Sequence, residues 1–404
     1  MIAFEEAQRR VVAACAVLEA ETVPLREAVG RVLAAPVRAR ADLVPFARSA
    51  MDGFAVIAAD VARSAELPVR DAVFAGSGAA AHEPGTATPI ATGAAIPAGA
   101  DAVVRIEDVA RNNGSVVVGA PVAAGEHVFP PGEDARAGDL ILAAGRRIGA
   151  ADAGLLAAAG HVDVAVTRRP RVAVVTTGDE IVDPRLEPGH GRIRNSNAVT
   201  IAATAAAWGC DVVLQLHAAD DAAKLRDALA ASLHACDLLI TSGGASVGER
   251  DLVKATLKEI GCTFAFESVA LRPAKPTAFA TRGNVRVAVL PGNPSSAFVA
   301  LHEIVRLAAL SLAGASDVRL PRIAATLATG HVHGKAERTY ACYAALRCAS
   351  GAWEATPLEN QCSALTRTAS DAAGFIVVPP GSGDYAPGDA VYVDVVDWTR
   401  VGSA

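Results

Sequence analysis

The residues best suited to chemistry in this chain lie between a predicted strand and a predicted helix. An apolar run over residues 238–240 is typical of a buried parallel strand, and Thr241-Ser242-Gly243-Gly244 follows it directly. Paired glycines permit a tight turn and the close approach of a ligand. Asp251 then opens a helical pattern that ends at Gly261. A plain connection is the alternative interpretation, but the hydroxyls of Ser242 and Ser246 and the Asp251 carboxylate favour a binding loop.

Further polar loops carry residues of the same kind. They are Thr177-Gly178-Asp179-Glu180, Asp220-Asp221, Arg272 to Lys275, and Pro291 to Ser296. In a doubly wound sheet such loops gather along one edge, where helix N-termini and cations bind phosphate or another oxyanion. Carboxylates beside phosphates usually hold Mg²⁺. The loops therefore predict a pocket for a phosphorylated or oxyanionic ligand, with metal-assisted phosphoryl chemistry. The motif G-x-x-x-x-G-K-[ST] is absent from the sequence, which argues against a P-loop enzyme.

An alternation of strand and helix patterns predicts the α/β domain that positions these loops. Strands are expected over residues 171–175, 212–216, 238–240 and 285–290, with helices ending near Trp208, Leu233, Gly261 and Leu312. We expect Asn197 to cap the first of these helices, Asp220-Asp221 the second, and Ser295 or Ser296 the last.

The flanking segments have different patterns. Residues 4–20 and 148–160 predict helices, whereas residues 56–134 lack helical periodicity and predict a small all-β insert. The segment from Asp317 to the end predicts a C-terminal β-domain. His331 and His333 would share one face of a strand there, but without a third nearby ligand a metal site is not favoured.

The composition limits the classes of function. The chain has 404 residues, enough for two to four domains, and a net charge of −6, which argues against nucleic acid or an anionic membrane as the main partner. We find neither an apolar run of about 18 residues nor a signal pattern, so we expect a soluble cytoplasmic protein. The seven scattered cysteines, with no C-x-x-C pair, are expected to be reduced.

Several motifs occur together along the chain. In order they are Pro45-Phe46-Ala47-Arg48-Ser49-Ala50-Met51-Asp52-Gly53-Phe54-Ala55, Thr92-Gly93, Gly132-Glu133-Asp134, Thr177 to Glu180, Ser242 to Asp251, Arg272-Pro273-Ala274-Lys275-Pro276, and Leu290-Pro291-Gly292-Asn293-Pro294-Ser295. With these motifs the chain resembles, over almost its whole length, the molybdopterin molybdenumtransferase (MoeA) family, which includes the gephyrin E domain.

The resemblance implies an α/β multidomain fold and an elongated homodimer. It implies a discontinuous helical domain (residues 1–42 and 135–168), a β-rich insert (43–134), a doubly wound α/β domain of the molybdopterin-binding type (169–316) and a C-terminal β-barrel (317–404). The implied reaction uses adenylylated molybdopterin and molybdate. It releases AMP and leaves molybdenum on the dithiolene, with Mg²⁺ as the metal.

The resemblance also implies the site residues. The catalytic carboxylates would be Asp52, Asp134, Glu180, Asp220 and Asp251, with Glu180 and Asp251 as metal ligands. The substrate-binding residues would be Thr92, Ser242, Gly243, Gly244, Ser246, Arg272, Lys275, Pro291, Asn293 and Pro294. In such dimers the partner's insert completes the cleft, so that groups far apart in one chain converge. A molybdopterin adenylyltransferase and recipient molybdoenzymes would be possible partners.

Two departures from the family pattern concern the basic loop. The usual Lys-Pro-Gly-Lys-Pro is Arg272-Pro273-Ala274-Lys275-Pro276 here, and a basic residue that often lies upstream is replaced by Glu267-Ser268. Arginine is a planar fork and lysine a point charge, so the two are not equivalent toward an oxyanion. Two alternatives to molybdenum insertion stay open: the preceding adenylyltransferase step, and a divergent, non-catalytic scaffold.

Overall fold

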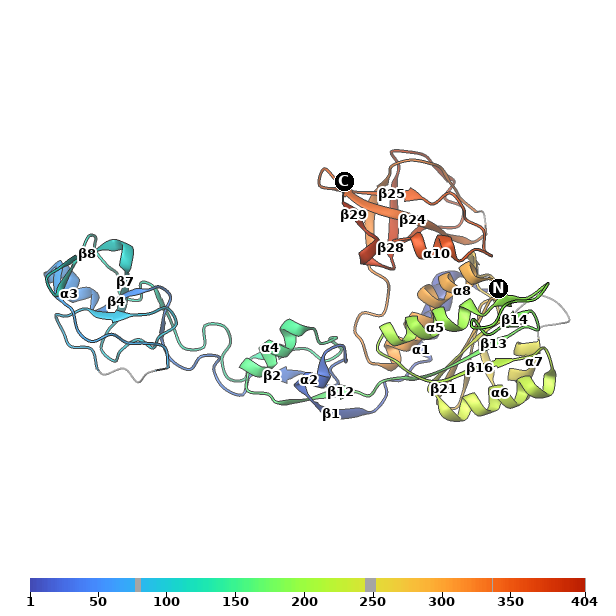
Figure 1. The fold of residues 1–404 in the computed structure, drawn as a ribbon, viewed down its shortest axis with the longest axis horizontal. Helices are drawn as coiled ribbons and strands as arrows, with labels where there is room; N and C mark the ends of the chain where they lie inside the picture. The colour runs from blue at the N-terminus through green and yellow to red at the C-terminus, as the bar shows by residue number, and fades with distance from the viewer. Residues whose placement is uncertain (77–80, 244–251, 336, 404) are drawn as a thin grey trace.

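The structure is a computed structural model that describes residues 1–76, 81–243, 252–335 and 337–403. The molecule is elongated, with the β-rich insert at one end and the α/β domain beside the C-terminal barrel at the other (Figure 1). A slender middle segment, through which the chain passes twice, separates the two ends. Residues of the insert and of the α/β domain of one chain are therefore far apart.

The α/β domain is built on a mixed sheet. Among the described residues its strand order is β16 (Asp211–Ala218), β13 (Arg171–Thr177), β17 (Leu238–Ser242), β21 (Val285–Leu290), β20 (Ala278–Arg282) and β18 (Thr263–Phe266). The first four strands are parallel to one another, β20 is antiparallel to β21, and β18 is antiparallel to β20, so β18 runs in the same direction as the first four. The carboxyl ends of the parallel strands therefore meet at one edge, where β20 begins.

Helices cover both faces of this sheet, which confirms the doubly wound prediction. Val172 and Val174 of β13 face one core with α1 (Phe4–Ala13), α5 (Ser196–Ala207), α8 (Pro294–Ala300) and α9 (Arg306–Leu312). Ala173 and Val175 face the other core with α6 (Ala222–Ala235) and α7 (Leu252–Glu259). The period-two alternation of a strand explains why successive residues enter opposite cores. Helix α1, from the N-terminal range expected in the helical domain, thus packs on the α/β domain.

The middle segment combines two stretches of chain. Strand β1 (Ala20–Pro24) pairs with β12 (Asp163–Thr167), and β2 (Val37–Arg38) pairs with β11 (Leu140–Leu142). Helices α2 (Leu25–Ala28) and α4 (Ala150–Ala158) pack on these strands around Leu33 and Leu156.

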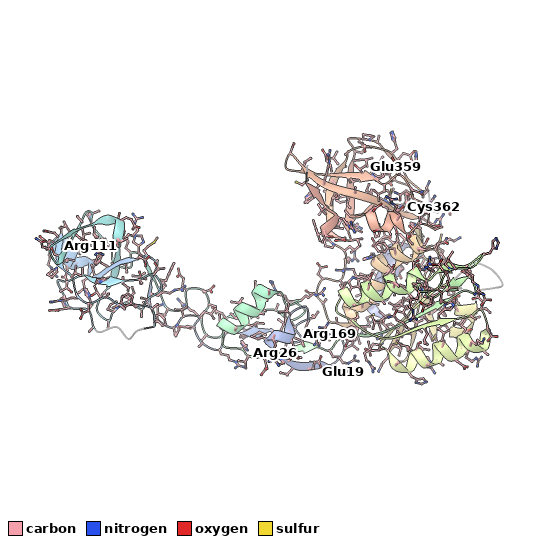
Figure 2. All side chains as sticks on the ribbon, in the orientation of Figure 1. Glu19, Arg26, Arg111, Arg169, Glu359 and Cys362 are labelled. Carbon is pink, nitrogen blue, oxygen red and sulfur yellow. The ribbon has the colours of Figure 1, made fainter. Side chains whose placement is uncertain are left out.

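Ion pairs fix the junction between the middle segment and the α/β domain. The Arg168 guanidinium bonds Glu19 at 2.7 Å and Asp237 at 2.7 and 2.9 Å. Figure 2 labels Glu19 and Arg169 at this junction. Because Asp237 immediately precedes β17, the junction is tied directly to the central strand of the sheet.

The insert contains two small sheets. Strand β4 (Gly53–Val56) lies between β6 (Thr88–Ile90) and β7 (Ala102–Arg105), and β9 (Ser115–Val118) lies between β5 (Glu66–Pro68) and β8 (Val109–Asn112). A Cβ at position 53 would lie 1.9 Å from the Val104 oxygen, so only glycine permits β4 and β7 to pair there. Strands β3 (Arg48–Ser49) and β10 (Val128–Phe129) of the insert form a separate antiparallel pair.

The sequence had suggested an all-β insert, but the insert also contains helical elements. It contains the helix α3 (Ala58–Arg63) and the turn η1 (Ile106–Asp108). The Asp101 carboxylate accepts a hydrogen bond from the Ala58 amide at 2.7 Å. This non-local acceptor at the start of α3 comes from 43 residues further along the chain, so local periodicity did not reveal the helix.

The C-terminal domain is a closed barrel of five described strands. The ring runs β24 (Thr339–Ala349), β25 (Ala352–Pro357), β22 (Arg322–Leu327), β28 (Ala390–Val395), β26 (Gly374–Val378) and back to β24. Strands β19 (Leu271–Arg272) and β29 (Gly402–Ser403) extend the sheet on β24. The remaining short elements are β23 (Val332–His333), which pairs with β27 (Asp384–Tyr385), α10 (Arg367–Asp371) and η3 (Trp398–Arg400).

Several predicted helix ends were wrong. The first helix ends at Ala13 instead of running to residue 20. Helix α5 is capped by Asn195, whose side chain accepts from the Ala198 amide, and not by Asn197. Helix α8 begins at Pro294 with Asn293 at the N-cap, because proline fits the first helical position, so neither Ser295 nor Ser296 is the cap.

Helices α8 and α9 form one continuous helix, Pro294–Leu312, joined by the π-helical turn η2 (Leu301–Val305). The helix is long and apolar enough to cross a membrane, but 83% of its most apolar 18-residue stretch is buried within the protein. It is therefore a core helix of the α/β domain.

A buried carboxyl group lies on this helix, where it meets α1 and the barrel. Gln8 donates to the backbone oxygen of Glu303 at 3.2 Å and to one side-chain oxygen at 3.5 Å, while the other side-chain oxygen has no partner. Arg322 holds the nearby Asp394 with two bonds of 2.7 Å. Burial, and then the charge of Asp394, raise the pKa of Glu303 well above its ordinary value.

We expect Glu303→Gln to stabilise the protein at neutral and alkaline pH. The unfolded chain loses the Glu303 proton near its ordinary pKa of 4.5, whereas the folded chain keeps it, so the wild type loses stability as the pH rises above that value. The melting temperature of the variant should match the wild type near pH 4.5 and exceed it by ~2–4 °C at pH 8. A constant difference across this range, measured by calorimetry, would contradict the raised pKa.

Candidate functional site

A cleft of about 890 Å³ opens at the carboxyl edge of the α/β sheet. Its walls come from the segments that follow β13, β16, β17 and β21, as predicted for a doubly wound sheet. The lining residues with polar side chains are Thr176, Thr177, Asp179, Glu180, Arg194, Asn195, Ser196, Asn197, Asp220, Ser242 and Asn293. A volume of this size is typical of a small-molecule binding site.

Tight packing between two strand ends forms the floor of the cleft. Gly243, with φ of +100°, follows β17, and a Cβ there would lie 2.3 Å from the Thr177 oxygen. The Ser242 hydroxyl donates to the Pro291 oxygen at 3.0 Å, which ties the end of β17 to the loop after β21. Ser242 and Gly243 therefore fix the shape of the site as well as lining it.

The segment that starts α5 crosses these strand ends. The Asn195 side chain donates to the Thr176 hydroxyl at 2.7 Å. The Asn197 side chain donates to the Ser242 hydroxyl at 2.9 Å and to the Gly292 oxygen at 2.8 Å. Sequence reasoning missed Asn197 as a site residue, because an asparagine near a helix start was interpreted as a cap.

Two predicted carboxylates line the cleft. Glu180 follows β13, and Asp220 follows β16, the neighbouring strand. Asp179 accepts a hydrogen bond from the Asp220 amide at 3.1 Å, which holds the two loops together. The side chains of Glu180 and Asp220 are exposed, and no ion pair neutralises either of them within the described part of the chain.

The chemistry of these donors suits magnesium. Mg²⁺ is usually bound by one or two carboxylates together with water and substrate phosphates, and the free oxygens of Glu180 and Asp220 meet that requirement. Over the described ranges no group of three or more His, Cys, Asp or Glu side chains could hold a metal ion, so substrate oxygens would have to complete the coordination. His333, which the sequence analysis considered as a metal ligand, forms a hydrogen bond of 2.9 Å with Asp384.

The C-terminal barrel also contributes to the cleft. Ala364 lines it, beside Pro291, Asn293 and Pro294. Asn293 donates to the Ser363 hydroxyl at 3.2 Å, and the Ser295 amide donates to the Ser363 oxygen at 3.0 Å. The loop around Ser363 went unpredicted because it belongs to a separate domain, and no local pattern indicates its position.

The basic loop does not line the cleft through its cations. Arg272 forms part of β19, in the sheet of the barrel, and its guanidinium lies 5.5 Å from the centre of the Tyr340 ring. Lys275 is exposed, and from this loop Pro276 lines the cleft. The loop reaches this edge because it joins the carboxyl end of β18, which runs in the same direction as β21, to the start of β20, which runs antiparallel to both.

Three predicted residues lie elsewhere in the chain. The Asp52 carboxylate accepts a hydrogen bond from the Thr92 amide at 2.7 Å, and both residues belong to the insert. Asp134 is exposed close to where the insert joins the middle segment. Figure 1 shows the insert at the opposite end of the molecule from β13 and β16, so this chain alone does not bring the two groups of carboxylates together. The predicted residues Gly244, Ser246 and Asp251 lie outside the described residues.

Family comparisons match three successive regions of the chain. Residues 2–160 match the MoeA N-terminal region (domain I and II), residues 173–310 match a probable molybdopterin binding domain, and residues 326–396 match the MoeA C-terminal region (domain IV). The cleft described above lies within the second match, apart from Ala364.

Curated and solved relatives agree with these matches. A molybdopterin molybdenumtransferase of Synechococcus elongatus is 37% identical to this protein over 75% of this chain and 78% of the relative's chain. The molybdopterin molybdenumtransferase of Bacillus subtilis is 34% identical over 97% of this chain and 93% of the relative's chain. The crystal structure of a molybdopterin biosynthesis MoeA protein from Pyrococcus horikoshii matches 98% of this chain and 100% of its own, with a TM-score of 0.85 and 25% identity. The chain therefore belongs to the molybdopterin molybdenumtransferase (MoeA) family.

Proposed function

We propose that this protein inserts molybdenum into adenylylated molybdopterin, using molybdate and releasing AMP. The observation that carries the proposal is the cleft itself, which Glu180, Asp220 and Asn197 line together at the edge of the molybdopterin-binding domain. Family membership supplies the substrate class, and the cleft supplies groups suited to a phosphorylated ligand.

Each part of the cleft has a chemical role in this proposal. Glu180 and Asp220 would hold Mg²⁺, which offsets the negative charge of the substrate phosphates while the phosphoanhydride bond breaks. Asp251 stays proposed as a further metal ligand on the strength of the sequence motif alone. Asn197, Ser242 and the Pro291–Pro294 loop position the substrate, because their mutual hydrogen bonds fix the wall of the cleft before the ligand arrives.

We also propose a cytoplasmic homodimer in which the insert of the partner completes each cleft. The support is the separation of Asp52, Thr92 and Asp134 from the cleft of their own chain, together with the exposure of Asp52 and Asp134. A molybdopterin adenylyltransferase would supply the substrate, and molybdoenzymes would receive the product.

The products of the reaction test the proposed function. Purified protein should convert adenylylated molybdopterin to molybdenum-loaded molybdopterin with one AMP released, and it should not consume ATP with molybdopterin. ATP consumption would indicate the adenylyltransferase step, and the absence of both reactions would indicate a scaffold.

As the binding groups for molybdate, we propose the cations of Arg272 and Lys275, which belong to the proline-stiffened loop that reaches the cleft at Pro276. A charge-assisted bond is worth about 1–3 kcal/mol, so Arg272→Ala and Lys275→Ala should each raise the molybdate concentration for half-maximal insertion by roughly 10- to 100-fold. The melting temperature should change little.

A molybdate titration of insertion measures this effect. Arg282→Ala is a matched control, because Arg282 lies at the opposite end of β20 from the cleft. Unchanged half-saturation in both loop variants would place the oxyanion elsewhere.

A further inference from the structure

One cationic residue lines the cleft together with the proposed metal ligands, and neither the motifs nor the family match singles it out. Among the described lining residues, the carboxylates are Asp179, Glu180 and Asp220, whereas Arg194 is the single cation. We infer that Arg194 is a substrate-binding residue that pairs with the phosphate groups of the nucleotide-linked substrate. This inference rests on the proposed function and adds a specific contact to it.

The backbone fixes the position of Arg194. Strand β15 (Ile193–Arg194) pairs with β14 (Ile181–Val182), and the flanking amides of Ile193 and Asn195 donate to the oxygens of Glu180 and Val182 at 2.8 and 2.9 Å. The buried side chain of Asn195 then anchors the segment to Thr176 and caps α5. Arg194 and Glu180 therefore belong to one small unit, and both residues line the same cleft.

The present partners of Arg194 can be exchanged for a phosphate. One guanidinium nitrogen bonds the Glu187 carboxylate at 2.8 Å, and the Nε donates to the Pro184 oxygen at 3.1 Å. The side chain of Glu187 is 95% exposed and that of Arg194 is 45% exposed, so water screens this ion pair and it stabilises the fold little. A guanidinium has five donors, and two of them account for these bonds, which leaves donors for a ligand.

The chemistry of the ligand favours this exchange. A phosphate or diphosphate accepts two parallel N–H bonds from an arginine, and such charge-assisted pairs are stronger than the exposed contact that they would replace. Arg194 would offset the negative charge that the substrate brings into a cleft already lined with carboxylates. The same residue would thus favour ligands with a phosphate over neutral pterins.

Binding of AMP and of inorganic pyrophosphate, each measured by calorimetry with Mg²⁺, tests the inference. Arg194→Ala should weaken the binding of both probes by roughly 10- to 100-fold, and Arg194→Lys should weaken it less, because lysine keeps the charge but not the fork. Glu187→Gln should bind as tightly as the wild type or severalfold more tightly, since it removes the competing carboxylate. Increasing salt should reduce the difference between the wild type and Arg194→Ala.

Arg192→Ala is the matched control, because Arg192 is an exposed arginine two residues away that does not line the cleft. Its affinity for both probes should equal that of the wild type. Wild-type affinity in a folded Arg194→Ala protein, or an equal loss in Arg192→Ala, would overturn the inference. Failure of the proposed function is a separate result: the wild type would then release no AMP from adenylylated molybdopterin, whatever residue occupies position 194.

Discussion

Glu180→Gln and Asp220→Asn should each reduce AMP release from adenylylated molybdopterin by ~10²–10³-fold, the loss expected when one preorganised electrostatic contact to the reacting group is removed. Both side chains line the cleft, both are exposed, and neither forms an ion pair within the described ranges. Each change removes a negative charge without altering the size of the side chain. The melting temperatures should therefore stay close to that of the wild type.

The magnesium dependence of the same reaction gives a second measurement. If Glu180 and Asp220 hold the metal, the variants should need a higher magnesium concentration for half-maximal AMP release. Asp221→Asn is a suitable control, because Asp221 is the adjacent carboxylate but caps α6 by accepting from the Lys224 amide at 2.9 Å, a role that asparagine also fills. Wild-type turnover in both cleft variants would remove these carboxylates from the mechanism.

Two inactive variants should restore activity when their chains form mixed dimers. Asp52→Asn changes the insert, Asp220→Asn changes the cleft, and the two positions are at opposite ends of one chain. If each cleft combines the α/β domain of one chain with the insert of the other, a mixed dimer contains one intact cleft and one doubly altered cleft. An equal mixture should then recover about a quarter of the wild-type activity, because half of the dimers are mixed.

The chains can carry two different affinity tags, so that the mixed dimers are isolated before the assay. Asparagine at position 52 keeps an oxygen for the hydrogen bond from the Thr92 amide, so the local fold of the insert should persist. Purified mixed dimers without activity, under conditions where wild-type dimers turn over, would contradict a shared cleft.

Local sequence patterns predicted the parts of the site that depend on a single strand and the loop after it. Glu180, Asp220 and Ser242 each follow a parallel strand, and parallel strands necessarily end at the same edge of the sheet. The apolar strand runs and the polar loops between them were enough to place these residues together.

Contacts between distant segments could not be predicted in this way. Ser363 bonds Asn293 of the cleft because the barrel packs against α8, and Asn197 contacts Ser242 because α5 begins two residues earlier than expected. The basic loop follows β18 at the edge where the cleft lies, but its Arg272 joins the barrel sheet, which no local pattern indicates. In each case tertiary packing, not local periodicity, decides where the side chain lies.

A crystal structure of the protein with adenylylated molybdopterin and Mg²⁺, without molybdate, tests the central claim most directly. We predict that the diphosphate lies in the cleft between Asn197 and the carboxylates of Glu180 and Asp220, with Arg194 turned from Glu187 toward a phosphate. A second cavity, of about 660 Å³, lies at the junction between the middle segment and the α/β domain, and it is lined by four arginines and three carboxylates: Arg31, Arg168, Arg169, Arg171, Glu19, Glu21 and Asp211. Ligand bound in that cavity, with the cleft at the sheet edge empty, would contradict the account.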